Sequence, residues 1–407
     1  MLPFAAELDL RLAALRAQGL HRDLRRVHSA PGARIEIAGG NSLNFSSNDY
    51  LGLASHPALK SAAIRAIEKY GAGSGASRLI CGSLAPFHEL EDTIAAFKKT
   101  EAALTFSTGY AAALGAITSL VGRADVLILD KLVHASIVDA AKLSGAKLRV
   151  FAHNDLNDLE VKLKWAASDS RPSSLVPRHI LVVTESIFSM DGDSAPLLEM
   201  VALKEKYGAW LMVDEAHATG IVGSQGRGLA DELGISSRLE IQMGTLGKAL
   251  GASGGFICGS RALIDYLVNR ARSFIFSTAP VPAAAAAAAA GIKISQSAEG
   301  EARRTQLRER VHEFCSSMVN RQSRISGAII PIMIGDENQA VAVASRLREQ
   351  NIFVPAIRYP TVAHGAARLR VTLSAAHSAA DVANLVNALK PIMNHLPSAA
   401  LAQEGES

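Results

Sequence analysis

Short apolar runs alternate with longer segments of helical spacing through the middle of the chain, from about residue 102 to residue 259. Polar positions hardly interrupt the runs, which is typical of strands buried on both faces of a sheet. The runs occupy residues 103–106, 126–129, 148–151, 180–183, 210–213 and 255–258. Strands separated by helical segments indicate a parallel arrangement. We therefore predict an α/β fold with a mostly parallel sheet between helix layers.

The segments on either side have a different pattern. Helical spacing covers residues 8–27, 57–70, 283–295, 301–321, 339–349 and 379–392, and short strands are expected after residue 32 and at 329–334, 353–357 and 369–373. The late strands and helices indicate a smaller α+β domain at the C-terminal end. We predict an N-terminal helix and arm at 1–55, a large domain at 56–290, a small domain at 291–397 and a disordered tail at 398–407.

Composition narrows the class of protein. Of the 407 residues 49% are hydrophobic, which is enough for a large core, and the net charge of +4 gives no basic stripe for nucleic acid. The three cysteines are far apart and form no Cys-x-x-Cys pair, which argues against disulfides and a zinc site. The charged N-terminus is not a signal peptide, and the longest apolar run, 283–290, is too short to cross a bilayer. We expect a soluble cytoplasmic protein without a metal centre.

Residues that follow the strands are the first candidates for chemistry, because sites in parallel sheets form beyond the carboxyl ends of the strands. The small residues of 107–111 precede a helix, where free backbone N–H groups could hold a phosphate or simply form a turn. His134 follows the second run, and could stack on a flat ring or be a structural histidine. The acidic residues and serines of 184–193 could take part in chemistry from a loop or could cap a helix.

Asp214 and Lys248 are the most informative of these residues. Asp214 ends a buried apolar run, where a carboxylate is costly unless a cation pairs with it, and a protonated pyridine nitrogen could be that cation. His217 lies three residues further on. Lys248 stands among glycine, alanine and leucine, which favours the neutral amine that a Schiff base requires. A solvated loop lysine is the alternative.

Two nucleotide-binding motifs are incomplete in this sequence, which makes a nucleotide-binding protein the weaker interpretation. The sequence 214–217 spells an acidic box found in some helicases, but the Gly247-Lys248 pair lacks the P-loop pattern, since Gln242 and Ala249 replace the required glycine and hydroxyl residue. Gly71-Ala72-Gly73 could begin a dinucleotide fingerprint, but Ala76 stands where the third glycine is required and no strand precedes the segment.

The combined set resembles the fold-type I pyridoxal-phosphate enzymes, and more narrowly the α-oxoamine synthases. The matching segments are Ser107-Thr108-Gly109-Tyr110, His134, Asp214-x-x-His217 and Thr245-x-x-Lys248, supported by 43–53, 151–155, 188–197, 356–361 and 368–373. The resemblance extends over about residues 8–392. It implies an aspartate-aminotransferase-like fold that binds pyridoxal 5'-phosphate in the large domain, and a homodimer.

The resemblance also implies roles for individual residues. Lys248 forms the Schiff base and moves the Cα proton, Asp214 pairs with the pyridine nitrogen, and His134 stacks on the ring and contacts substrate. The other cofactor contacts that it implies are Gly109, Tyr110, Ser189, His217 and Thr245. Arg25, Thr361 and Arg358 are the implied substrate contacts, with Arg358 a partner for a carboxylate.

The activity implied is a decarboxylative condensation of an amino acid with an acyl thioester. The nearest branch joins L-alanine to a pimeloyl thioester, on coenzyme A or a carrier protein, and makes 8-amino-7-oxononanoate in biotin synthesis. Three alternatives stay open: a sister synthase that uses glycine with an acetyl or succinyl thioester or serine with a palmitoyl thioester, a nucleotide-driven motor, and a non-catalytic protein that has kept the fold.

Overall fold

The computed structural model describes residues 2–37, 39–168, 178–318 and 327–394, so the tail predicted at 398–407 lies outside the described residues. The chain divides into two compact units. The larger unit contains the described residues of 48–308 together with Gly327, and the smaller unit contains those of 1–47, 309–322 and 328–407. The predicted boundary near residue 290 falls inside a helix, whereas the units divide near residue 308.

The larger unit is built on a seven-stranded sheet with the order β3-β9-β8-β7-β6-β4-β5. The strands are β3 Ala102–Phe106, β4 Val126–Asp130, β5 Lys147–Phe151, β6 Ile180–Glu185, β7 Trp210–Asp214, β8 Ile241–Thr245 and β9 Gly255–Gly259. Strands β5, β4, β6, β7 and β8 pair in parallel, and β9 is antiparallel to both β8 and β3. The predicted mostly parallel sheet is confirmed.

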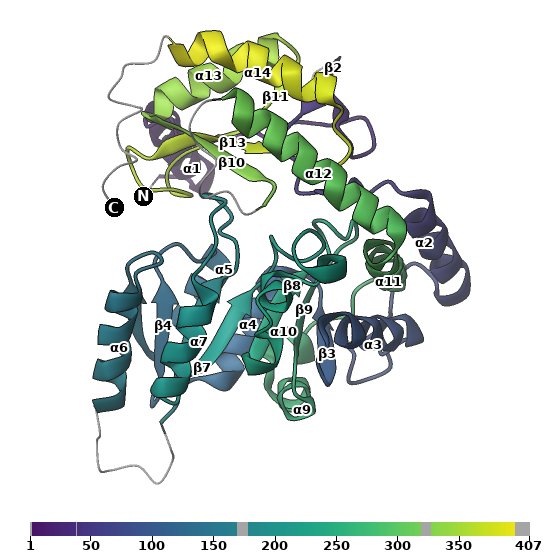
Figure 1. The fold of residues 1–407 in the computed structure, drawn as a ribbon, viewed down its shortest axis with the longest axis vertical. Helices are drawn as coiled ribbons and strands as arrows, with labels where there is room; N and C mark the ends of the chain where they lie inside the picture. Colours follow the sequence, from purple (N-terminus) through teal and green to yellow (C-terminus); the bar gives the residue numbers. More distant parts are fainter. Residues whose placement is uncertain (1, 38, 169–177, 319–326, 395–407) are drawn as a thin grey trace. The chain divides into compact units, whose positions relative to one another are not determined.

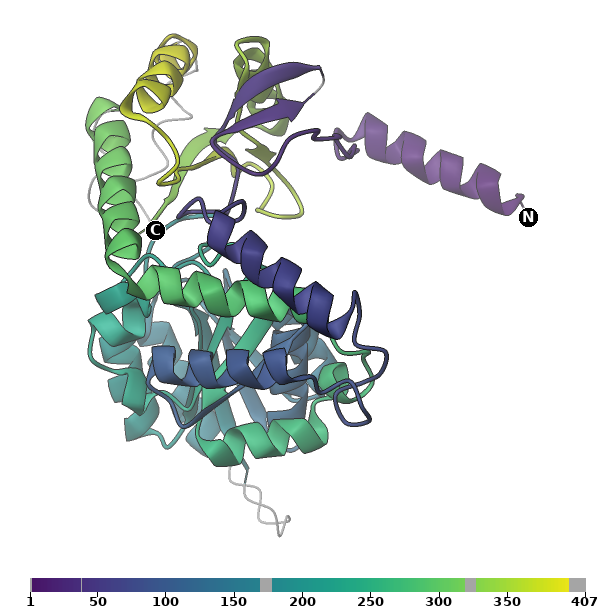
Figure 2. The ribbon, with the colours of Figure 1, turned by 90° about the vertical axis from the view of Figure 1, so that its right-hand side faces the viewer.

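Helices cover both faces of this sheet (Figure 1). The helices of the larger unit are α2 Pro57–Tyr70, α3 Ala85–Lys98, α4 Gly109–Leu120, α5 Ala135–Ser144, α6 Leu156–Ser168, α7 Leu197–Lys206, α8 Leu229–Glu232, α9 Arg261–Arg270, α10 Arg272–Ile275 and α11 Pro282–Gln296. Alternate strand residues such as Leu127 and Ile128 pack into different clusters, one with α4, α5 and α9 and the other with α6 and α7. Helices α3 and α11 fill a third cluster, and α2 packs on α11 (Figure 2).

The smaller unit has two three-stranded sheets. One has the order β1-β2-β11, from Arg34–Ile37, Gly40–Asn44 and Ile352–Phe353, and the other has the order β10-β13-β12, from Ile329–Gly335, Ala367–Thr372 and Ala356–Ile357. Helices α13 Glu337–Glu349 and α14 Ala379–Asn394 bury Leu347 and Leu389 in this unit, and α12, Ala298–Ser317, connects the units along the chain. The N-terminal segment pairs with the C-terminal one through β2 and β11.

Three expectations about elements were wrong. The single strand expected at 353–357 is two strands in different sheets, β11 and β12. The N-terminal helix α1 spans Phe4–Ala17 instead of 8–27, because Gly19 has a φ of +66°, which ends a helix, and none of its residues is buried. Strand β8 was not expected, because Gln242 and Gly244 interrupt its apolar pattern. Gln242 is nevertheless buried, with only 1% of its surface exposed. Among the described residues, no helix is long and apolar enough to cross a membrane.

Candidate active site

Six strands of the large sheet, β3, β4, β5, β6, β7 and β8, have their carboxyl ends at the same edge. Strands β4, β5, β6, β7 and β8 are parallel, and β3 runs in their direction because both β3 and β8 are antiparallel to β9. The residues predicted to carry chemistry in the larger unit stand at or just after these carboxyl ends: Gly109, Tyr110, His134, Ser189, Asp214, His217, Thr245 and Lys248. The fold therefore gathers segments that are up to 139 positions apart in the chain (248 − 109 = 139).

The side chains of Lys248, His217 and Tyr50 form a series of hydrogen bonds. Its Nζ lies 2.7 Å from Nε2 of His217, and Nδ1 of the same histidine lies 2.6 Å from the hydroxyl of Tyr50. Tyr50 is fully buried and His217 is buried. A charged lysine only donates, so Nε2 then accepts from it and Nδ1–H donates to the hydroxyl of Tyr50, whereas a neutral amine can pair with either tautomer. The contact orients the lysine nitrogen toward His217.

Asp214 is a buried carboxyl group at the end of β7. Its Oδ1 accepts the N–H of Ala216 at 2.9 Å. Burial raises the pKa of Asp214, and the charge of the nearby Lys248 opposes that rise. A buried carboxyl group that interacts with a lysine beyond the next strand can attract a cationic ligand to the same place.

His134 and Ser189 lie on neighbouring loops. His134 is the N-cap of α5, where its Nδ1 accepts the N–H of Ser136 at 3.2 Å. Burial lowers the pKa of His134, which favours the neutral ring. Ser189 is buried, and its N–H donates to the carboxyl group of Glu185 at 3.2 Å.

A charged histidine fixes the loop that carries Ser189. His153 contacts Asp130 at 3.0 Å through Nδ1 and Asp193 at 2.9 Å through Nε2. Burial lowers the pKa of His153, but these two carboxylates outweigh it and raise the value to about 10. The histidine is therefore charged at neutral pH, and it connects the end of β4 with the loop after β6.

The start of α4 offers backbone N–H groups for a phosphate. Thr108 caps the helix by accepting the N–H of Ala111 at 3.0 Å, and Gly109 is the first helical residue. A Cβ on Gly255 would lie 2.6 Å from the backbone of Gly109, so the glycine lets β9 approach this helix start. Tyr110 is exposed and donates to Asp139 at 2.8 Å, and Thr245 donates to the carbonyl of Gly254 at 3.0 Å.

Of the four predicted substrate residues, His134 lies in the larger unit, and Arg25, Arg358 and Thr361 lie in the smaller unit. Arg358 donates to the carbonyl of His21 at 2.8 Å, and the N–H of Thr361 donates to the carbonyl of Arg358 at 3.0 Å. Burial and the charges of Arg22 and Arg25 lower the pKa of Arg358. Three guanidinium groups that repel one another form a positive region where an anion could bind.

A buried ion pair between Lys98 and Glu215 lies at the end of β7. Lys98 donates to the carboxylate of Glu215 and to the carbonyl of Arg227, and the side chains of the pair are 1% and 0% exposed. Glu215 also accepts the N–H of Ala230 at 2.9 Å, and a Cβ on Gly228 would clash with its carboxylate. The pair connects α3 and the loop before α8 to the residue that follows Asp214.

We expect Lys98→Met to destabilise the protein by about 3–5 kcal/mol, because it leaves a buried carboxylate without its cation. The measurement is the free energy of unfolding in urea. Lys99→Met is the matched control: Lys99 pairs with Asp231 from a 58% exposed side chain, so its loss should cost at most about 1 kcal/mol. Equal losses in the two variants would contradict this account of the buried pair.

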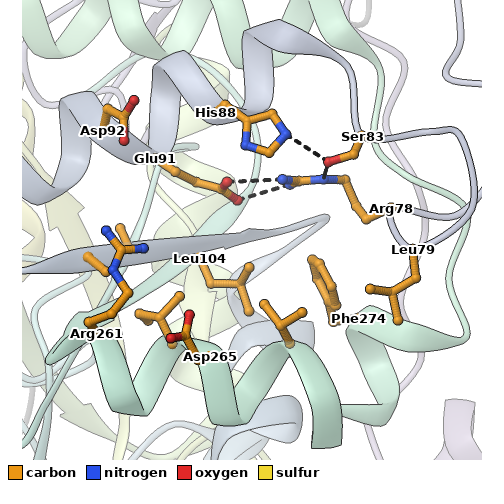
Figure 3. Close-up of a pocket in the computed structure, with 14 residues that line it drawn as sticks. Arg78, Leu79, Ser83, His88, Glu91, Asp92, Leu104, Arg261, Asp265 and Phe274 are labelled. Carbon is orange, nitrogen blue, oxygen red and sulfur yellow. Dashed lines mark hydrogen bonds and ion pairs between the residues drawn. The ribbon is translucent and has the colours of Figure 1, made fainter.

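A cavity of about 240 Å³ lies elsewhere in the larger unit, beside the start of α3 (Figure 3). Its main polar feature is Arg78, which donates to both carboxylate oxygens of Glu91 at 2.9 Å and to Ser83 at 3.0 Å. Glu91 in addition accepts the N–H of Thr105. Arg78 and Glu91 thus bond to each other and to neighbouring residues of the protein. None of the predicted site residues lines this cavity.

Two residues near Lys248 were missed as site residues in the sequence. Tyr50 belongs to the polar loop of 44–50, whose composition alone does not show that its hydroxyl reaches His217. Glu185 ends β6 beside Asp214, and a carboxyl group at the end of a buried run was the available signal. The roles predicted for the other residues remain predictions.

Comparisons with known proteins identify relatives over nearly the whole chain. The family described as aminotransferase class I and II matches residues 41–389. Curated relatives named 8-amino-7-oxononanoate synthase include those of Geotalea daltonii, 46% identical over 96% of this chain and 97% of that protein, and of Anaeromyxobacter sp. strain Fw109-5, 48% identical over 95% of each.

Solved structures are similar as well. A serine palmitoyltransferase from S. paucimobilis with a bound PLP–myriocin aldimine has a TM-score of 0.87 at 28% identity, covering 95% of this chain and 97% of its own. An 8-amino-7-oxononanoate synthase from Francisella tularensis has a TM-score of 0.72 at 29% identity, covering 87% and 97%.

Proposed function

The chain belongs to the aminotransferase class I and II family, and from this we propose that it joins L-alanine to a pimeloyl thioester with loss of carbon dioxide, forming 8-amino-7-oxononanoate. Curated relatives at 44–48% identity over most of the chain carry the name of that synthase. The observation that carries the proposal is the placement of the Lys248 amine and the buried Asp214 carboxyl group at one sheet edge. We further propose that the protein works as a homodimer.

Pyridoxal 5'-phosphate is the cofactor, and the residues present fit it. The start of α4 presents the backbone of Gly109 and Tyr110 to the phosphate, and the buried Asp214 supplies a carboxylate for the pyridine nitrogen. Lys248 supplies the amine for the covalent link. The cofactor, when bound, supplies a protonated ring that draws off the electron pair left on the amino acid Cα.

Lys248 acts as the base in this proposal. Its Nζ, fixed by His217, removes the proton from Cα of L-alanine and later returns a proton to the product. A base bound in the same site as the substrate lowers the barrier for the transfer through proximity. Tyr50 keeps the imidazole ring of His217 oriented while the proton moves.

Asp214 keeps positive charge on the ring side of the site. Its carboxyl group is buried, where one fixed negative charge stabilises a neighbouring cation more strongly than in water. His134, neutral because burial lowers its pKa, presents a flat uncharged ring from the start of α5. In the smaller unit Arg25, Arg358 and Thr361 serve the acyl donor, which carries a carboxylate at its far end.

The substrates can be tested by product mass. Purified protein with pyridoxal 5'-phosphate should release carbon dioxide and form 8-amino-7-oxononanoate from L-alanine and a pimeloyl thioester, offered on coenzyme A and on an acyl carrier protein in separate reactions. Glycine with acetyl or succinyl thioester should give little product. Turnover of glycine without turnover of L-alanine would overturn the proposal.

Serine palmitoyl transfer is the second candidate, since the serine palmitoyltransferase structures give the higher TM-score of 0.87. The same assay separates it, because L-serine with a palmitoyl thioester would then be the productive pair. The curated relatives favour the first candidate.

A further inference from the structure

Glu185 is a buried carboxyl group at the centre of the candidate site to which the proposed reaction assigns no task. It is the last residue of β6 and lies in register with Asp214, the last residue of β7. Register partners on parallel strands point to the same face of a sheet, so the two carboxyl groups are neighbours. Glu185 is 2% exposed.

The carboxyl group connects the two loops on which ring contacts are predicted. Its Oε2 accepts the N–H of Ser189 at 3.2 Å, and the group also accepts the N–H of His134. These loops follow different strands, β6 and β4. One side chain therefore fixes the backbone of both. Its second oxygen, Oε1, is buried and has no hydrogen-bond partner among the residues that the structure describes.

Charges around Glu185 favour its neutral form. Burial and the charge of Asp214 from β7 raise its pKa to about 8, against the charge of Lys248 and the N–H groups of His134 and Ser189, which lower it. Two carboxylates this close cannot both ionise without a large cost. A neutral acid still accepts hydrogen bonds through one oxygen, and its other oxygen carries the proton.

We infer that Glu185 is a positioning residue, a neutral carboxylic acid that holds the loops of His134 and Ser189 in place and leaves the negative charge of this strand pair on Asp214. The inference depends on the proposed function only for the cofactor site that these loops serve. The geometry of the carboxyl group and its neighbours carries it.

Unfolding as a function of pH tests the neutral acid without the cofactor. A glutamate with a pKa of 4.5 when unfolded and about 8 when folded makes the protein lose stability as pH rises from 4.5 to 8. Glu185→Gln has no such proton, so its thermal midpoint should rise relative to the wild type across this interval and then level off. Glu160→Gln is the control: hydrogen bonds from Lys206 and Tyr207 lower the pKa of Glu160 to about 2, so the difference from wild type should stay flat there.

Cofactor binding tests the positioning role. In equilibrium dialysis of the full chain with pyridoxal 5'-phosphate, Glu185→Ala should raise the dissociation constant at least about tenfold, because both loops lose their acceptor. Glu185→Gln keeps an acceptor and a donor, and should restore the constant to within about threefold of the wild type.

Two results would overturn the inference. One is a flat pH difference for Glu185→Gln, and the other is equal loss of cofactor affinity in the glutamine and alanine variants. If Glu185→Ala does not fold, the glutamine variant still decides through its pH trend and its affinity. A wild-type chain that does not bind the cofactor would instead reject the proposed function, and the pH test would remain valid.

Discussion

Replacing Lys248 with alanine will reduce turnover by at least about 10³-fold, because the variant loses both the covalent attachment and the base at Cα. The amine that is lost is the one that lies 2.7 Å from His217 and is fixed there. The measurement is product formation from L-alanine and a pimeloyl thioester. Borohydride reduction of the wild-type protein with its cofactor, followed by peptide mapping, should label Lys248.

Lys60→Ala is the control for this experiment, since Lys60 is exposed on α2. It should keep full turnover and leave the label on Lys248. Both variants should unfold near the wild-type temperature, so that lost turnover is not confused with lost structure. A label on another side chain, or normal turnover in Lys248→Ala, would end the assignment of the base.

Replacing Asp214 with asparagine is expected to slow removal of the Cα proton by about 10²–10³-fold. Asparagine keeps the size and an oxygen that can accept the N–H of Ala216, but it has no charge to keep the pyridine nitrogen protonated. Exchange of the Cα proton of L-alanine in deuterated water, followed by NMR, measures this step without an acyl donor.

The protein should remain folded after this change, because burial already raises the pKa of Asp214 and a neutral side chain removes that cost. Cofactor should still be retained through Lys248 and the start of α4. Exchange at the wild-type rate in Asp214→Asn would show that the carboxylate does not support the reaction, even if the cofactor binds normally.

The apolar runs are sufficient to predict six of the seven strands of the central sheet. They correspond to strands β3, β4, β5, β6, β7 and β9. All except β5 are buried and therefore apolar along their length, whereas β5 lies at the sheet edge with Arg149 and Val150 exposed. The residues at or after the parallel runs include His134, Asp214 and His217, and a parallel sheet brings such positions to one edge. Lys248 follows β8 instead, so its place at this edge could not be read from the predicted runs. Strand β8 escaped prediction because its buried Gln242 and Gly244 break the pattern.

The resemblance indicated the family, the cofactor and the substrate class, all of which depend on motifs that can be read along the chain. The resemblance did not show which side chains of this protein contact one another. The segment of 43–53 supported the resemblance, yet nothing in it shows that the Tyr50 hydroxyl meets His217 from 167 positions away. The pairing of Lys98 with Glu215 across 117 positions was equally invisible.

The sequence alone was thus enough to predict most elements, the candidate chemistry and the reaction class. These predictions depend on apolar runs and motifs, whose residues lie close together in the sequence. Only the tertiary structure shows which side chains form ion pairs or hydrogen bonds with one another. Glu185 shows the reason. Its carboxyl group is positioned by the register of β6 against β7 and by the loops that carry His134 and Ser189. The distance between such groups depends on strand pairing and not on their separation in the chain.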